Sequence, residues 1–154
     1  TVAAGASYDS AGGTFSGSAY VFERNQDGAD SWGEIAKLTP LDAAGGERLG
    51  YSIAISGDTV VAGAPYGSSG HSATGAAYVF ERNRGGIDNW GQFSKQVARG
   101  GATDDAFGFS VSVSGDTVAV GAPYDDGSNG SESGSAYVFY PPAEDIYLPL
   151  ILSN

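Results

Sequence analysis

The loop "PYDDGSNGSESG" gathers the side chains of this sequence best suited to bind a cation. It holds Asp125, Asp126, Asn129 and Glu132, and Ca²⁺ takes roughly six to eight oxygen ligands, mostly carboxylates and carbonyls. The corresponding loop "PYGSSGHSATG" has no carboxylate, and "SYDSAGGTFSG" has only Asp9. Two hypotheses follow for the loop at 123–134: a calcium site, the one possible cofactor of this chain, or a hydrated acidic loop without a ligand.

Catalytic chemistry finds little support in the residue types. The sequence has no cysteine, which excludes thiolate nucleophiles, disulfides and cysteine-bound zinc. Its only histidine, His71, has no carboxylate close to it in sequence, and no G-x-S-x-G motif is present. We therefore expect a protein that is not an enzyme.

The charge balance limits the partners. Eighteen acidic residues against seven basic ones give a net charge of -11, which repels nucleic-acid phosphates and anionic lipid headgroups. No apolar run approaches the roughly 20 residues that a membrane-spanning helix needs. We expect no nucleic-acid partner and no membrane insertion. The scarcity of lysine and the absence of methionine favour an exported protein processed from a longer precursor.

Internal repeats organise the chain. "AYVF" occurs at 19–22, 77–80 and 136–139, and "GDTV" occurs at 57–60 and again at 115–118. A spacing of 58 to 59 residues is typical of a repeat architecture in which each copy is one structural unit. The copies cover about 1–40, 49–98 and 107–140, and the outer two are incomplete.

Each copy is predicted to be a four-stranded antiparallel meander. "YSIAIS" has the period of two that marks a strand, and the Gly-Asp pair at 57–58 is a hairpin signal. "TVVAGA" is apolar or small on both faces, as expected for a strand between two sheets. "AAYVFER" alternates bulky with small residues, and the more polar "WGQFSKQV" suits an edge. The fold class is therefore all-β, with about three four-stranded antiparallel meanders over residues 1–140, and alternating bulky and small residues let one meander interdigitate with the next.

Repeated aromatic residues are predicted to have structural roles. A tyrosine directly follows the second strand of each copy, where we expect a structural role at the rim, and a tryptophan begins the fourth strand of the first two copies. An aromatic residue at one position of every blade is more often a packing residue than a sugar platform. The residues concerned are Tyr8, Tyr66, Tyr124, Trp32 and Trp90.

The stretch "FGFSVSVSGDTVAVGAP" resembles the FG-GAP repeat, the blade unit of integrin α-subunit β-propellers and of many secreted bacterial proteins. The Phe-Gly half stands at 107–108 and the Gly-Ala-Pro half at 121–123. The second copy has Leu-Gly at 49–50 and Gly-Ala-Pro at 63–65. The resemblance implies a β-propeller type of fold, in which the three meanders are four-stranded blades of an incomplete ring. It also implies an extracellular or cell-surface role in adhesion or scaffolding.

The resemblance also implies calcium, at a place where this sequence departs from the family. Calcium-binding FG-GAP blades carry an Asp-rich loop between their first and second strands. Here that connection is only Gly57-Asp58 and Gly115-Asp116, and one carboxylate in a two-residue turn cannot form the oxygen cage. We predict turn-forming roles for Asp58 and Asp116.

Incomplete outer copies predict assembly. The first copy lacks its first strand, so Thr1 and Val2 begin an open edge that recruits another strand. The chain holds fewer blades than the roughly 4–8 of a closed ring. We predict a structural or adhesive module that associates with copies of itself or with missing blades of the same protein. The alternative is the C-terminal part of a larger propeller that binds calcium, a glycan or a cell-surface protein through the loops between second and third strands.

The segment 141–154, "PPAEDIYLPLILSN", lies outside the repeats and is predicted to add a strand. Two prolines end the preceding strand because neither has a backbone N–H. The apolar run that follows either fills the fourth position of its own blade, which the short linker favours, or pairs with the open blade of a neighbour by strand addition. The assembly residues of this segment are Ile146, Tyr147, Leu148, Leu150, Ile151 and Leu152.

Overall fold

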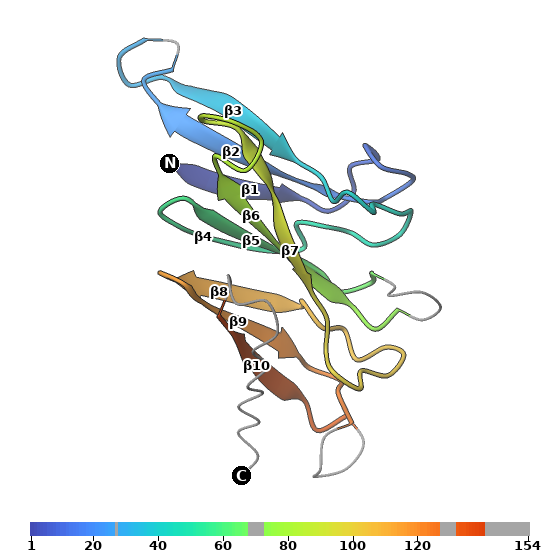
Figure 1. Ribbon diagram of the computed structural model, residues 1–154. Helices are drawn as coiled ribbons and strands as arrows, with labels where there is room; N and C mark the ends of the chain where they lie inside the picture. The colour runs from blue at the N-terminus through green and yellow to red at the C-terminus, as the bar shows by residue number, and fades with distance from the viewer. Residues whose placement is uncertain (27, 68–72, 127–131, 141–154) are drawn as a thin grey trace.

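A computed structural model describes residues 1–26, 28–67, 73–126 and 132–140. Within these ranges the regular elements are ten β-strands arranged in three antiparallel sheets (Figure 1). The prediction of an all-β chain is confirmed. Over the same residues no helix is long and apolar enough to cross a membrane.

Each sheet is one copy of the repeat, and we call the sheets blades 1, 2 and 3. Blade 1 consists of β1 (Val2–Ala6), β2 (Ser18–Arg24) and β3 (Trp32–Leu38) in that order. Blade 2 consists of β4 (Ser52–Ser56), β5 (Thr59–Ala64), β6 (Ala76–Arg82) and β7 (Trp90–Gln96). Blade 3 consists of β8 (Ser110–Ser114), β9 (Thr117–Ala122) and β10 (Ser135–Phe139). The meander is complete in blade 2, and the outer blades have three described strands each.

The Gly-Asp turns close the first hairpin of blades 2 and 3. Gly57 and Gly115 have φ values of 56° and 58°, in the left-handed region that favours glycine. Beyond the first turn Ser56 pairs with Thr59, and the ladder continues to the pair Ser52 and Gly63. This register places alternate residues of each strand on opposite faces of the blade.

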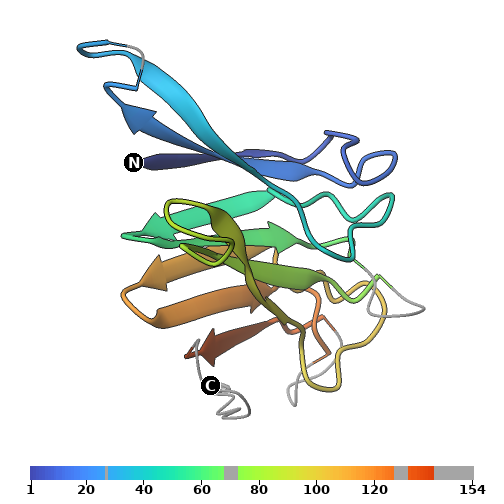
Figure 2. The ribbon, with the colours of Figure 1, turned by 45° about the horizontal axis from the view of Figure 1, so that its top comes forward.

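The blades stack face to face, and the two faces of a strand serve two different cores (Figure 2). The bulky face of blade 2 packs against blade 1 and carries Val60, Ala62, Tyr78 and Phe80. Its small face packs against blade 3 and carries Val61, Ala77 and Val79. All seven of these residues are at most 1% exposed. This double burial is the reason that "TVVAGA" has no polar face.

Backbones of neighbouring blades touch at the glycines of the repeated motif. A Cβ on Gly63 would lie 1.9 Å from the carbonyl oxygen of Gly108, and one on Gly5 would lie 2.0 Å from that of Gly50. The Leu-Gly or Phe-Gly half of one blade thus rests on the Gly-Ala half of the preceding blade. Parallel bridges from Gly17 to Leu49 and from Gly75 to Phe107 extend the same contact.

Candidate functional site

The bulky face of blade 1 has no covering blade among the described residues. Val2 is 44% exposed, Ala4 is exposed, and Tyr20 and Phe22 are half-buried. The equivalent residues of blade 2, one repeat later, are buried against blade 1. An apolar face of this kind is a docking surface for another apolar face.

The small face of blade 3 is uncovered in the same way. Ala136 is exposed, and Ala119, Gly121 and Val138 are half-buried. Their counterparts in blade 2 lie in the core shared with blade 3. Among the described residues the stack of blades therefore ends in a bulky face on one side and a small face on the other, the two kinds of surface that meet inside it.

The edge of β1 is open within the described part of the chain. β1 pairs with β2 alone, whereas the equivalent β5 is paired on both sides. Thr1 and Val2 are exposed there, and the Thr1 hydroxyl donates a hydrogen bond of 3.2 Å to Glu23. The predicted assembly residues of the tail, Ile146 to Leu152, lie outside the described residues.

The acidic loop of blade 3 is tied to its own blade. Asp125 accepts a hydrogen bond from the Tyr137 hydroxyl, and Asp126 Oδ1 accepts one of 2.7 Å from the backbone N–H of Glu132. Burial, followed by the nearby Asp125 carboxylate, raises the pKa of Tyr137 above its ordinary range. Asn129, the remaining predicted ligand, lies outside the described residues, as does His71.

Asp9 shows the same loop-to-strand tie in blade 1. Its Oδ2 atom accepts hydrogen bonds of 2.8 Å from the hydroxyls of Ser18 and Tyr20, and lies 2.7 Å from Lys37 Nζ. The Lys37 ammonium is the main reason that the pKa of Asp9 lies well below its usual range. Because Asp9 and Asp125 occupy equivalent positions, their shared contact with a strand tyrosine supports a structural role for both.

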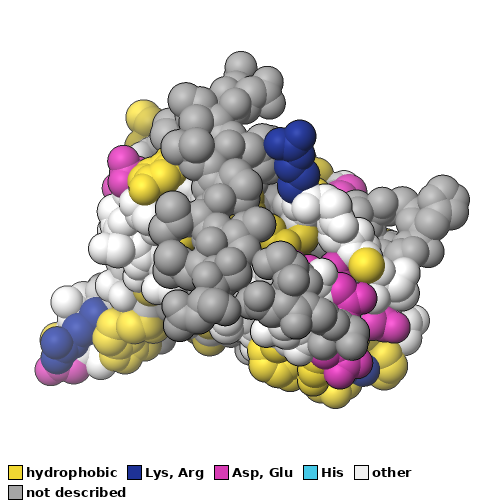
Figure 3. All heavy atoms as spheres, turned by 90° about the horizontal axis from the view of Figure 1, so that it is seen from below, with side chains coloured by type: hydrophobic (Ala, Val, Ile, Leu, Met, Phe, Trp, Pro, Cys, Tyr) yellow, Lys and Arg dark blue, Asp and Glu magenta, His cyan; other side chains and the backbone are white. Residues whose placement is uncertain are grey.

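A hollow of about 380 Å³ lies beside the acidic loop and is mostly lined by carboxylates. Its lining residues are Thr103, Asp104, Asp105, Tyr124, Asp126 and Glu132. Burial is the main reason that the pKa of Asp105 is raised, and the neighbouring carboxylates add to it. Figure 3 shows acidic side chains gathered beside hydrophobic ones on one side of the molecule. Among the described residues no three His, Asp or Glu side chains are placed to hold one metal ion.

The aspartates of the Gly-Asp turns contact other groups of the protein. Asp58 Oδ1 lies 2.9 Å from Arg82 Nε, and Arg82 also pairs with Glu23 of blade 1. Asp116 accepts a 3.3 Å hydrogen bond from the hydroxyl of Thr117. These contacts agree with turn-forming roles, and Arg82 adds an ion pair between blades that the sequence does not reveal.

The repeated tyrosines lie where a structural role at the rim was predicted, and the two tryptophans differ in their packing. Tyr8, Tyr66 and Tyr124 lie at the rim of the blades but are 62%, 42% and 52% exposed. Trp32 is half exposed, whereas Trp90 packs against the core between blades 1 and 2. Of the two tryptophans, only Trp90 thus has the packing role that the repeat predicts. Tyr66 contacts Tyr51, which in turn contacts Phe109, and these two exposed residues directly precede β4 and β8.

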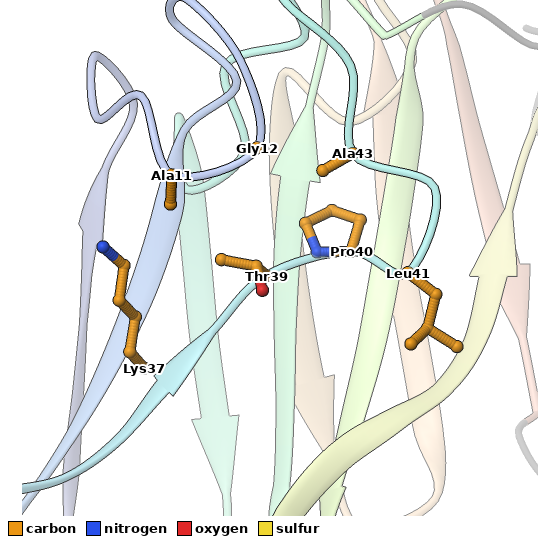
Figure 4. A pocket seen from close by; sticks show the side chains of 7 residues that line it. All are labelled: Ala11, Gly12, Lys37, Thr39, Pro40, Leu41 and Ala43. Carbon is orange, nitrogen blue, oxygen red and sulfur yellow. The ribbon is translucent and has the colours of Figure 1, made fainter.

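A second hollow, of about 490 Å³, lies at the rim of blade 1 (Figure 4). Lys37 of β3 lies beside Ala11 there, and Pro40 and Leu41 line the other side. The Lys37 ammonium is already paired with Asp9. This hollow offers no unpaired charge and is a weak candidate for specific binding.

Comparison with known proteins gives one result for the repeats. A family model described as "FG-GAP repeat" matches residues 32–80 and 90–139, which together are more than half of the chain. No curated protein matches the chain.

Proposed function

Because this chain belongs to the FG-GAP repeat family, we propose that it is a non-enzymatic, extracellular β-propeller module with a structural or adhesive role. It associates through its open blades and its C-terminal segment. The partner is a copy of itself or further blades of the same protein.

The uncovered end faces carry this proposal. The small face of blade 3 has the same residue pattern as the small face of blade 2, which buries Ala77 and Val79 against a neighbour. The bulky face of blade 1 has the pattern that blade 2 uses against blade 1. Head-to-tail contact between these faces repeats an interface that the molecule already contains, and such contacts build rings or filaments.

Light scattering during size-exclusion chromatography, over a range of protein concentrations, tests the association. We expect Val2→Asp and Ala136→Asp to shift the wild-type oligomer toward monomer, because each places a charge on an end face. Ile87→Asp is the matched control, since Ile87 is 91% exposed and lies on neither end face. A wild-type chain that is monomeric at about 100 micromolar would refute self-association and leave further blades of the same protein as the partner. Variants that assemble like the wild type would refute the role of the end faces.

Calcium or glycan binding by the loops after the second strands stays the alternative. The acidic hollow beside 123–126 supports it by charge alone. Calorimetric titration of the wild type and of Asp126→Ala with Ca²⁺ tests calcium binding. A glycan array tests glycan binding. Absence of heat at millimolar Ca²⁺ rejects the metal site.

A further inference from the structure

Neighbouring blades meet at the rim in two equivalent places, each between a pair of repeated tyrosines, and we call these places notches. An arginine side chain fills the first notch. It lies between blades 1 and 2, where the guanidinium of Arg48 lies 4.9 Å from the ring centroid of Tyr8 and 4.5 Å from that of Tyr66. A cation over the face of an aromatic ring is attracted by the negative charge of that face. The first notch thus shows which chemical group this pair of tyrosines accepts.

The second notch lies one repeat further, between blades 2 and 3, and is hollow. Its volume is about 190 Å³. The lining includes Tyr66, Ala73, Asp104, Ala106, Phe109 and Tyr124. Tyr66 and Tyr124 occupy the positions that Tyr8 and Tyr66 hold in the first notch.

The second notch is hollow because two large side chains are replaced by alanine. Ala106 stands where the first notch has Arg48, and Ala73 stands where it has Phe15. The backbone has the same left-handed conformation at Arg48, with a φ of 57°, and at Ala106, with a φ of 56°. The space left open is therefore the space that a guanidinium fills one repeat earlier.

The second notch also carries a carboxylate that the first one lacks. Asp104 replaces Gly46, and its exposed side chain has no ion-pair partner among the described residues. The acidic hollow shares Asp104 and Tyr124 with the notch and adds Asp105, Asp126 and Glu132. The surroundings thus attract a positive charge, on a chain whose net charge is -11.

We propose that the second notch binds an arginine side chain of a partner polypeptide. A guanidinium is planar, so it stacks on tyrosine rings while its N–H groups reach a carboxylate in a bidentate arrangement. The rings of Tyr66 and Tyr124 and the Asp104 carboxylate offer both interactions. The site is separate from the end faces, so it stands or falls independently of self-association.

NMR titration with two short peptides tests the proposal. The probe is acetyl-Gly-Arg-Gly-amide, and the lysine analogue is the control of equal charge. We expect saturable shifts of the amide signals of Ala106, Phe109 and Tyr124 with the arginine peptide. Binding of the lysine peptide should be about two- to fivefold weaker, the range that a stacking preference gives at an exposed site.

Variants of the notch complete the test. Ala106→Arg supplies the missing guanidinium from the chain itself and should abolish binding. Ala102→Arg adds the same charge outside the notch, where residue 102 is exposed, and should leave most of the binding. Tyr124→Leu keeps an apolar side chain but removes the ring, and should weaken binding about two- to fivefold.

Two results would overturn the proposal. One is an arginine peptide that binds Ala106→Arg, verified as folded by its amide spectrum, as well as it binds the wild type. The other is a set of shifts spread over the acidic surface that Tyr124→Leu does not change, because this indicates non-specific attraction to a negatively charged protein.

Discussion

Replacing Gly63 by alanine should separate blades 2 and 3. The new methyl carbon would lie 1.9 Å from the carbonyl oxygen of Gly108 and 2.9 Å from its carbonyl carbon, where a carbon–oxygen contact needs about 3.3 Å. Both atoms belong to the backbone, so no rotamer change relieves the overlap. The blades must move apart by more than an ångström locally, and a gap of about 1 Å already forfeits about half of the dispersion energy at the affected contacts.

The expected cost follows from two opposing effects. Overpacking a tight interior costs about 1–3 kcal/mol, and this overlap belongs at the upper end because backbone meets backbone. Alanine in place of glycine restricts the unfolded chain, which stabilises the folded protein by about 0.4–1 kcal/mol. We expect a net loss of about 2–2.6 kcal/mol in the free energy of unfolding, which for a chain of this size lowers Tm by about 4–10 °C.

Gly121→Ala is the matched control for this experiment. The equivalent glycine of blade 3 would place its Cβ 2.4 Å from the Oγ of Ser110, and at Gly63 the Oγ of Ser52 lies at 2.3 Å. A serine side chain can rotate, so this shared overlap costs under about 1 kcal/mol. Urea and thermal unfolding, measured at a concentration where the chain is monomeric, compare the two variants. Equal losses of stability in Gly63→Ala and Gly121→Ala would refute the role of the contact between blades.

Three further predictions concern the tail and two carboxylates. Deleting residues 143–154 should lower Tm or reduce the oligomeric size measured by light scattering; an unchanged Tm and size would show that the tail adds no strand. Asp9→Asn should lower stability at pH 7, because the lowered pKa of Asp9, due mainly to Lys37, stabilises the folded chain above the ordinary value of 3.8. That difference from the wild type should vanish as the pH falls through the folded-state pKa, and a constant difference down to low pH would contradict it. Asp105→Asn should change stability in the opposite direction. Burial raises the pKa of the Asp105 carboxyl, so its charged form destabilises the fold at pH values above that pKa. Asparagine can still accept the hydrogen bond that the backbone N–H of Ala102 donates. The variant should be more stable than the wild type at pH 7, and the gain should disappear below pH 3.8.

The blade architecture could be read from the sequence because its signals are local. A period of two over six residues, a Gly-Asp pair and a repeat of 58 residues each act within one blade. They predicted β4 to β7 and the stacking of bulky against small faces, which the structure contains. The exposure of the tyrosines at the rim was not predictable in this way, because it depends on which loops of the next blade cover them.

By itself the sequence determined the strands, their turns, the number of blades and the family, since period-two patterns and turn chemistry depend on near neighbours along the chain. Only the tertiary structure decided which residues of different blades meet. Arg48 reaches Tyr8 of the preceding blade and Tyr66 of its own, and Gly63 touches Gly108 of the next. The repeat aligns Arg48 with Ala106 in the sequence. The hollow between Tyr66 and Tyr124, however, exists only because the stacking of blades 2 and 3 brings these two tyrosines together.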